Sequence, residues 1–150
     1  MATATPLAGI TVLDFGQVYN GPYCGFLLAQ AGARVIKVES PAGESLRGRS
    51  GSARPSFPFR MFNSAKQCIT VNIKHPEGRQ LILDLVPQVD VVLENFSPST
   101  LADNGLGSSV LRELNPRVIY ASGTGYGGSG PYRDYLGMDI TLQAMSGVMS

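Results

Sequence analysis

The fold is decided by residues 10–39, which read ITVLDFGQVYNGPYCGFLLAQAGARVIKVE. The β-branched runs Ile10–Phe15 and Arg34–Glu39 at its two ends are typical of strands. Pro22 lies between them where a helix can begin, and Gly32 can end that helix because glycine adopts a left-handed conformation at no steric cost. The stretch therefore predicts a β-α-β unit, in which a right-handed crossover joins two parallel strands.

The alternation of strands and helices continues along the rest of the chain. We expect further strands over 68–73, 89–94 and 117–121, and helices over 23–31, 76–86, 109–114 and 139–149. In the second of these helices, the predicted apolar stripe consists of Leu81, Ile82 and Leu85. Residues 40–61 are rich in Gly, Pro, Ser and Arg, and are predicted to form one long loop. This pattern favours an α/β fold built on a mostly parallel sheet.

Composition excludes several classes of protein. Hydrophobic residues make up 43% of the 150 residues, enough to build a core, so a disordered chain is excluded. No apolar run reaches the roughly 18 residues that a membrane span needs. Residues 1–9 also lack the basic and apolar regions of a signal peptide. We therefore expect a cytoplasmic protein with no membrane partner.

The cysteines and the histidine exclude two kinds of site. Cys24 and Cys68 are too few for a disulfide framework and are interpreted as buried free thiols in a reducing compartment. With His75 as the one histidine, they are also too few for an ordinary zinc site, so no metal is predicted.

The positive charges are unevenly distributed. No acidic residue lies between Glu44 and Glu77, a stretch that holds six of the twelve basic residues, namely Arg47, Arg49, Arg54, Arg60, Lys66 and Lys74. Either this is a solvated basic loop, or it is a site for an anion, since clustered positive charge raises the local anion concentration. Nucleic acid is a poorer candidate, because the pI is near 7.8 and aromatic residues do not alternate with basic ones. A small phosphorylated ligand fits the stretch better.

The familiar nucleotide and hydrolase motifs are missing or misplaced. Residues 123–128, GTGYGG, have the spacing G-x-G-x-x-G, but they follow the fifth strand and do not open a helix directly. A substrate-facing loop or a plain turn is therefore favoured over an NAD site. A catalytic triad would have to use His75, which is more simply a helix-entry residue. Asn95 and Phe96 follow the fourth strand, where they would form either a capped turn or a contact with a heterocycle.

Blocks of sequence spread over essentially the whole chain carry a resemblance to a known family. They are Pro6–Ile10, Val12–Phe15, Gly21-Pro22, Gly32–Glu39, Phe62-Asn63 with Lys66, Asp90–Phe96, Asn115–Tyr120, Gly130–Tyr132 and Gln143–Gly147. Together they resemble the N-terminal part of the class III CoA-transferases. This is the family of formyl-CoA transferase, the carnitine CoA-transferase and α-methylacyl-CoA racemase.

The resemblance implies a Rossmann-like, mostly parallel α/β sheet with flanking helices. Residues 1–150 would be the N-terminal part of the large CoA-binding domain, a fold that is incomplete without its C-terminal part. The family's small domain and return segment would lie beyond Ser150, and its members form interlocked homodimers. The implied ligand is coenzyme A or acyl-CoA, bound as a substrate and not as a tightly held cofactor, with a carboxylic acid as the other substrate.

By position, the family's contacts with CoA fall after the first strand, at the third strand and after the fourth strand. These residues are Val18, Tyr19, Val71, Asn72, Ile73, Lys74, Asn95, Phe96 and Ser97. The resemblance implies that Lys74 meets phosphate and that Val71 and Ile73 border the adenine.

Two departures from the family bear on the phosphate contacts. Ser40 stands where some members have an arginine, and Asp103 or Asn104 stands where some have a basic residue. Phosphate contacts are therefore also expected from Arg47 or another arginine of the loop.

The family's nucleophile is an aspartate, which attacks the acyl-CoA thioester and passes through a covalent aspartyl intermediate. Neither Asp134 nor Asp139 matches it, so we expect it beyond Ser150, with no catalytic residue in this chain. The racemase branch has a histidine at the position of Met138, which we place in the CoA site. Because methionine cannot transfer a proton, transferase chemistry is favoured. The alternatives are an acyl-CoA racemase and a non-catalytic module for CoA binding or dimerisation.

Overall fold

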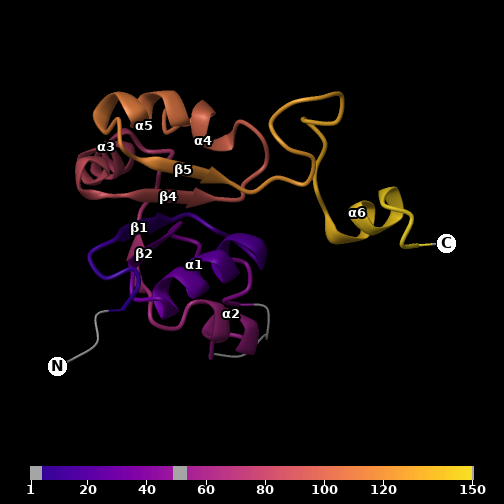
Figure 1. Ribbon diagram of the computed structural model, residues 1–150, viewed down its shortest axis with the longest axis horizontal. Helices are drawn as coiled ribbons and strands as arrows, with labels where there is room; N and C mark the ends of the chain where they lie inside the picture. The colour runs from indigo at the N-terminus through magenta and orange to yellow at the C-terminus, as the bar shows by residue number, and fades with distance from the viewer. Residues whose placement is uncertain (1–4, 49–53, 150) are drawn as a thin grey trace.

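The computed structural model describes residues 5–48 and 54–149, and its centre is a five-stranded sheet (Figure 1). The strands are β1 (Thr11–Asp14), β2 (Arg34–Glu39), β3 (Gln67–Thr70), β4 (Val91–Glu94) and β5 (Ile119–Ser122). They lie in the order β3-β2-β1-β4-β5, and every neighbouring pair is parallel. The predicted parallel α/β fold is confirmed.

Helices cover both faces of the sheet (Figure 1). They are α1 (Asn20–Gln30), α2 (Phe57–Phe62), α3 (Pro76–Leu85), α4 (Thr100–Asp103), α5 (Ser108–Leu114) and α6 (Asp139–Met145), with a 3-10 turn over Val86–Gln88. In Figure 1, α1 and α2 lie on one side of the sheet, and α3, α4 and α5 lie on the other. From β1 the chain builds toward one edge through β2 and β3, and then returns to place β4 and β5 on the other side of β1. The neighbours β1 and β4 therefore form the topological switch point of the sheet.

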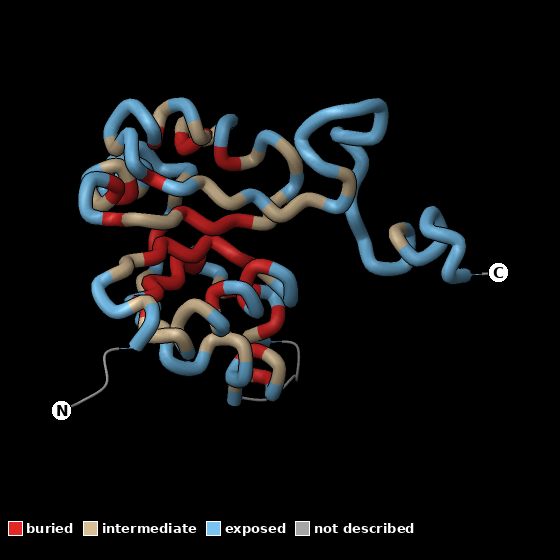
Figure 2. The backbone as a smooth tube through the Cα atoms, in the orientation of Figure 1, coloured by how far each residue is buried: buried red, intermediate tan, exposed pale blue. Residues whose placement is uncertain are grey.

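Two hydrophobic clusters, one on each face of the sheet, hold the layers together. The larger cluster joins Leu13 of β1 to Ile82 of α3. The smaller joins Val12 of β1 to Val35 of β2, with Leu28 of α1 packed against it. Neighbouring residues of a strand point to opposite faces, so Val12 and Leu13 are both fully buried but in different clusters. Figure 2 shows this buried layer running through the sheet.

Helix α1 begins earlier than predicted and ends where predicted. Tyr19 is its N-cap, and Pro22 lies in the first turn, where the helix needs no donor from the backbone nitrogen. At the other end, Gly32 follows the C-cap Ala31 with a φ of 100°, a left-handed conformation that favours glycine.

The prediction of one long loop over 40–61 is wrong for its last part, which contains α2. Ser56 caps this helix, because its Oγ accepts a hydrogen bond from the Phe59 N–H at 3.3 Å, and Pro58 lies in the first turn. The Ser56 hydroxyl also donates to the Leu46 carbonyl at 2.6 Å, which ties the start of α2 to the preceding loop. Ser56 and Pro58, which were both assigned to the loop, thus start a helix.

Two further predictions are wrong. Leu81 is 55% exposed, because the buried side of α3 is centred on Ile82 and continues to Val86 in the next turn. Cys24 and Cys68, interpreted as buried thiols, are both exposed.

The segment that follows β5 leaves the body of the domain (Figures 1 and 2). Residues 123–149 are mostly exposed, and α6 has no buried residue. As predicted, residues 123–128 form a loop and no helix follows them directly. Within the described part of the chain, no helix is long and apolar enough to cross a membrane.

Candidate functional site

The carboxyl ends of β1 and β4 meet at the topological switch point. Open α/β sheets bind their ligands in the crevice at such a point. Here two hydrogen bonds join the loops that follow the two strands: the Gln17 N–H donates to Asn95 Oδ1 at 2.6 Å, and Asn95 Nδ2 donates to the Gln17 carbonyl at 2.9 Å. We call this pair the Asn95–Gln17 bridge.

The loop after β1 is compact because two glycines approach each other closely. A Cβ added to Gly21 would lie 2.6 Å from Gly16 Cα and 2.7 Å from Asn95 Oδ1, so no side chain fits there. Val18 adopts a φ of 61°, a costly conformation for a β-branched residue, and its N–H donates to Glu44 Oε1 at 3.0 Å. The close approach of Gly16 and Gly21 and the hydrogen bond from Val18 to Glu44 therefore fix the conformation of the loop.

On one side of the bridge lies a cavity of about 520 Å³, which we call the β3-side cavity. Five of the residues predicted to contact CoA line it: Val71, Asn72, Ile73, Lys74 and Phe96. Gln17 and residues 38–42, which include Ser40, line it too. Its volume lies within the range of about 300–1,000 Å³ that is usual for small-molecule sites.

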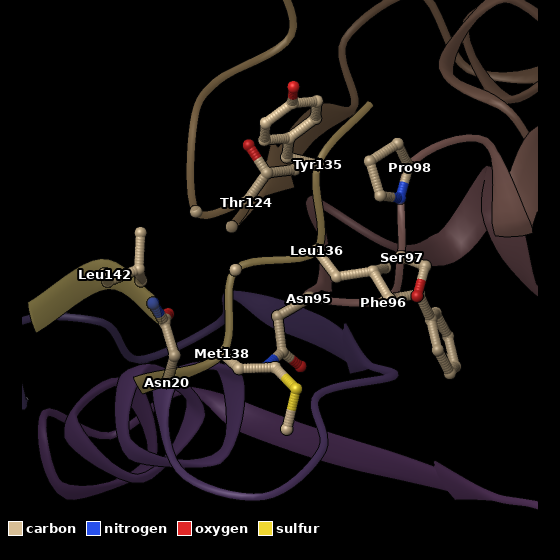
Figure 3. Close-up of a pocket in the computed structure, with 13 residues that line it drawn as sticks. Asn20, Asn95, Phe96, Ser97, Pro98, Thr124, Tyr135, Leu136, Met138 and Leu142 are labelled. Atoms are coloured by element: carbon tan, nitrogen blue, oxygen red, sulfur yellow. The ribbon is translucent and has the colours of Figure 1, made fainter. Parts of the chain in front are cut away.

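On the other side of the bridge lies a cavity of about 370 Å³, which we call the β5-side cavity (Figure 3). Four of the predicted contact residues line it: Asn95, Phe96, Ser97 and Met138. Figure 3 shows Asn20 near Asn95 and Met138, with Thr124 and Tyr135 across the opening. None of the described side chains that line it is charged. Because Phe96 lines both cavities, they adjoin at this residue.

The structure does not bring Val18 and Tyr19 into either cavity. Tyr19 instead lines a wide apolar hollow beside α1, where its ring meets the Phe62 ring edge to face with 5.8 Å between the centroids. Both residues directly follow Gln17, so they lie in the loop that borders the site.

Arg47 is held by Glu39. Arg47 Nε donates to Glu39 Oε2 at 3.0 Å and Nη2 donates to Oε1 at 2.6 Å, while the guanidinium lies 4.1 Å from the centre of the Phe59 ring. Burial acts to raise the pKa of the Glu39 carboxyl, but the hydrogen bonds and charge of Arg47 hold that pKa below its usual value. The contact between Arg47 and phosphate stays a prediction. Arg49, the next arginine of the loop, lies outside the described residues.

Sequence reasoning missed a buried ion pair beneath the site. The side chains of Lys66 and Asp14 are fully buried, with Lys66 Nζ 2.7 Å from Asp14 Oδ2. Lys66 Nζ also donates to the Pro22 carbonyl at 2.8 Å and to Asn63 Oδ1 at 3.1 Å. Burial lowers the pKa of the Lys66 ammonium, and Asp14 opposes that effect. The pair ties β1, α1 and the end of α2 together.

A second buried lysine supports the same loop. Lys37 is fully buried and its Nζ donates to the Gly16 carbonyl at 2.7 Å. The signal that could have found it is a charge between the apolar residues Ile36 and Val38 in the middle of strand β2, because a buried strand excludes an unpartnered charge. Among residues 5–48 and 54–149, no three His, Cys, Asp or Glu side chains gather where a metal ion could bind.

Comparison with known proteins gives consistent matches. The sequence pattern of CoA-transferase family III matches residues 7–150. An acyl-CoA transferase of Fusarium pseudograminearum is 46% identical, over 95% of this chain and 34% of its own length. A succinate–glutarate CoA-transferase of Agrobacterium fabrum is 43% identical, over 97% of this chain and 38% of its own length. A crystal structure of a mutant Mycobacterium tuberculosis protein matches with a TM-score of 0.90 at 42% identity, over 98% of this chain and 40% of that one. The chain thus spans less than half the length of these relatives.

Proposed function

This chain belongs to CoA-transferase family III, and we propose that it forms the N-terminal, CoA-binding part of an enzyme that moves CoA from an acyl-CoA to a carboxylic acid. The observation that carries the proposal is the pair of adjoining cavities at the switch point of the sheet, one on each side of the Asn95–Gln17 bridge. CoA has a nucleotide at one end and a thiol at the other, so its site needs two connected compartments of different character.

The nucleotide end of CoA fits the β3-side cavity. Val71 and Ile73 offer apolar surface to the adenine, and Lys74 offers a cation to phosphate. Asn72 Oδ1 accepts a hydrogen bond from the Lys74 N–H at 3.2 Å, which shapes the turn that presents the lysine.

The thiol end of CoA fits the β5-side cavity. The pantetheine arm would pass Phe96, which lines both cavities, and would bring the thioester to Ser97 and Met138. Uncharged amides such as Asn20 and Asn95 suit a thioester carbonyl, which accepts hydrogen bonds and carries no charge. Val18 and Tyr19 would reach the ligand from the bordering loop.

The proposed chemistry uses an aspartate that lies outside residues 1–150. Its carboxylate attacks the thioester carbonyl of the donor, which forms a mixed anhydride and releases the CoA thiolate. The thiolate then attacks the aspartyl carbonyl, so the donor leaves as a carboxylate and CoA remains on the enzyme as a thioester. The acceptor carboxylate attacks the carbonyl of the aspartyl thioester, which forms a second mixed anhydride and releases the CoA thiolate again. The thiolate then attacks the acceptor's carbonyl in that anhydride, so the acceptor leaves as the new acyl-CoA and the aspartate carboxylate is regenerated. This chain keeps the thiolate in place between the steps by holding the rest of CoA.

Met138 distinguishes this proposal from racemase chemistry. A racemase needs a group that removes the α-proton of the acyl chain, and the thioether of Met138 cannot hold that proton. A non-catalytic CoA-binding module would use the same cavities but would form no covalent intermediate.

One experiment separates the three functions. The protein that comprises residues 1–150 together with the part that holds the proposed aspartate, called the full chain below, is incubated with succinyl-CoA and glutarate. This pair is suggested by the name of the Agrobacterium fabrum relative. Other acyl-CoA and carboxylate pairs follow. Chromatography of the products and the intact mass of the protein are both recorded. We expect a new acyl-CoA and a protein carrying CoA. Exchange of the α-proton with solvent deuterium and no transfer would indicate a racemase, and CoA binding with neither reaction would indicate a module.

We propose a homodimer in the cytoplasm, with residues 1–150 as the N-terminal part of a larger CoA-binding domain. Light scattering of the full chain tests the dimer, and a monomer at working concentration would contradict it.

A further inference from the structure

Three neighbouring strands of the sheet end in a buried acid. Asp14 is the last residue of β1, Glu39 of β2 and Glu94 of β4, and none of the three is more than 6% exposed. Each carboxylate accepts a hydrogen bond from an N–H of the loop that follows its strand. For Glu94 the donor is the Phe96 N–H, which lies 2.8 Å from Oε2. The three acids therefore shape the loops at the carboxyl edge of the sheet, and each places a negative charge inside the protein.

Two of these three charges have a partner. Lys66 Nζ lies 2.7 Å from Asp14 Oδ2, and Arg47 Nη2 lies 2.6 Å from Glu39 Oε1. Glu94 differs, because it forms no salt bridge within the described part of the chain. A buried carboxylate is costly unless a positive charge balances it.

The second oxygen of Glu94 has only a weak partner. Tyr120 lies on the neighbouring strand β5 and on the same face of the sheet, and its hydroxyl donates to Glu94 Oε1 at 3.5 Å. That distance is longer than the roughly 2.5–3.0 Å that is usual for such a bond. Burial raises the pKa of the Tyr120 hydroxyl and the charge of Glu94 raises it further, so the tyrosine is a neutral donor that leaves the charge unbalanced.

Glu94 lines a cavity of about 160 Å³ at the ends of β4 and β5, where α4 and α5 begin, and we call it the hydroxyl cavity. Among the described residues, Glu94 is the only charged one in its lining. Besides Tyr120, the lining residues that carry a hydroxyl are Ser97, Ser99, Thr100, Ser108, Ser122 and Thr124.

Most of these hydroxyls are not used within the fold. The Ser99 hydroxyl donates to Asp103 Oδ2 at 2.8 Å, and Thr124 Oγ1 accepts from the Gly127 N–H at 2.8 Å. The other four serine and threonine hydroxyls form no hydrogen bond within residues 5–48 and 54–149. The cavity thus collects a carboxylate oxygen and several hydroxyl oxygens, all of which have lone pairs to offer.

We propose that the hydroxyl cavity binds one monovalent alkali cation, with the Glu94 carboxylate and the surrounding hydroxyl oxygens as its ligands. Hard cations are bound by oxygen ligands of this kind. One carboxylate balances one positive charge, whereas a Ca²⁺ site usually gathers several carboxylates. A cation and some of its own waters fit the volume, since one water occupies about 30 Å³ of liquid.

The cation would do for β4 what Lys66 does for β1 and Arg47 does for β2. It would join the loop after β4 to the end of β5 through Ser97 and Ser122. Ser97 also lines the β5-side cavity, so the cation would stabilise the loop that borders that cavity. The proposal uses no contact with CoA and therefore does not depend on the proposed function.

Hydrogen exchange of the full chain tests the site in potassium chloride and in tetramethylammonium chloride at the same concentration. Tetramethylammonium carries the same charge but leaves no position open for oxygen ligands, so it controls for ionic strength. We expect amides of residues 91–103 to exchange about tenfold more slowly in potassium chloride, once its concentration is roughly ten times the dissociation constant. Peptides from residues 11–30, where Lys66 already supplies the positive charge, should change little.

A pair of matched variants identifies the carboxylate. Glu94→Gln removes the charge but keeps an oxygen for the Phe96 N–H, and Glu113→Gln removes an exposed carboxylate from α5. We expect Glu94→Gln to exchange equally fast in the two salts, and Glu113→Gln to respond as the wild type does. A wild type that exchanges alike in both salts would overturn the proposal, as would a potassium response that Glu94→Gln retains.

A milder variant keeps the proposal testable if Glu94→Gln does not fold. Ser122 is paired with Glu94 in the register of β4 and β5, and Ser122→Ala removes one hydroxyl of the cavity. We expect it to weaken potassium about threefold in a titration followed by exchange. Ser109→Ala, which changes an exposed serine outside the cavity, should leave the titration unchanged. Equal effects of the two serine variants would contradict the assignment.

Crystals of the full chain soaked in a thallium(I) salt give an independent check, because thallium(I) resembles potassium in charge and size and scatters X-rays anomalously. We expect an anomalous peak beside the Glu94 carboxylate. A cavity that holds only water, or one filled by a lysine or arginine from outside residues 1–150, would show that the charge is balanced in another way and would overturn the proposal. None of these results bears on CoA binding, so the proposed function stands or fails separately.

Discussion

Replacing Lys66 by methionine tests whether the buried pair beneath the site is a structural tie. The change keeps most of the apolar stem and removes the ammonium that donates to Asp14, to the Pro22 carbonyl and to Asn63. Because Asp14 has no exposed side-chain surface, its carboxylate would be left buried without a counter-ion. Breaking a buried ion pair on one side costs about 3–5 kcal/mol, since the remaining charge cannot be solvated.

The size of the effect appears most directly in hydrogen exchange. A loss of about 3–5 kcal/mol corresponds to roughly 10²- to 10⁴-fold faster exchange of amides that the pair protects. Those amides belong to β1 and to α1, which Lys66 joins through Asp14 and Pro22. Mass spectrometry of peptides spanning residues 11–30 of the full chain measures the change, and peptides from α5 serve as an internal reference.

The double variant Asp14→Asn with Lys66→Met supplies the control. Asparagine keeps an oxygen for the Gly16 N–H, which donates to Asp14 Oδ1 at 2.7 Å in the wild type, and neither charge of the pair remains. We expect the double variant to recover at least half of the lost protection. If Lys66→Met changes exchange less than about fivefold, or if the two substitutions simply add, the pair does not tie these elements together.

Three further predictions follow from other contacts of the site. Arg47→Gln should lower the free energy of unfolding by about 1 kcal/mol at pH 7. The value is small because the Arg47 side chain is 41% exposed and solvent screens its charge. Urea unfolding at pH 7 and pH 3 measures the difference from the wild type. The pKa of Glu39 is depressed in the folded state, so its ion pair with Arg47 stabilises the fold above about pH 4.3. That stabilisation is lost as the pH falls through the folded pKa. The difference in unfolding free energy between Arg47→Gln and the wild type should therefore shrink at pH 3. Gly21→Ala should weaken CoA binding by at least tenfold, because the new Cβ would overlap Gly16 and the Asn95 amide; unchanged affinity by calorimetry would show that the bridge does not shape the site. Lys74→Ala should weaken CoA about tenfold, and an unchanged dissociation constant would remove Lys74 from the phosphate contacts.

The local elements of the fold were predictable because their signals are local. The β-branched runs that became β1 and β2 need only their neighbours in sequence to be identified, and Gly32 marks the end of α1 by its own conformational freedom. The short helix α2 was missed because its N-cap Ser56 and its proline Pro58 are also typical of loops. Leu81 was misplaced because three adjacent apolar residues leave the rotation of the helix about its axis undetermined.

The candidate site was predictable only in part. The family resemblance selected residues at the carboxyl ends of the strands, and the structure brings Val71, Lys74 and Phe96 of that set to one cavity. It could not show that Glu39 holds Arg47, because the loop between them has no periodic pattern that places a guanidinium. Nor could it show that Arg79, five residues beyond Lys74 and about one turn into α3, lines the same small hollow as Lys74.

The sequence by itself determined the strands, most of the helices, the parallel α/β class and the family, because each depends on neighbouring residues or on blocks in linear order. The tertiary structure alone decided which distant side chains meet. Gln17 and Asn95 are 78 positions apart, and Asp14 and Lys66 are 52 apart. Gln17 and Asn95 come together because a parallel sheet collects the carboxyl ends of neighbouring strands at one edge. Lys66 reaches Asp14 from the segment between α2 and β3. Both contacts depend on how the whole chain packs.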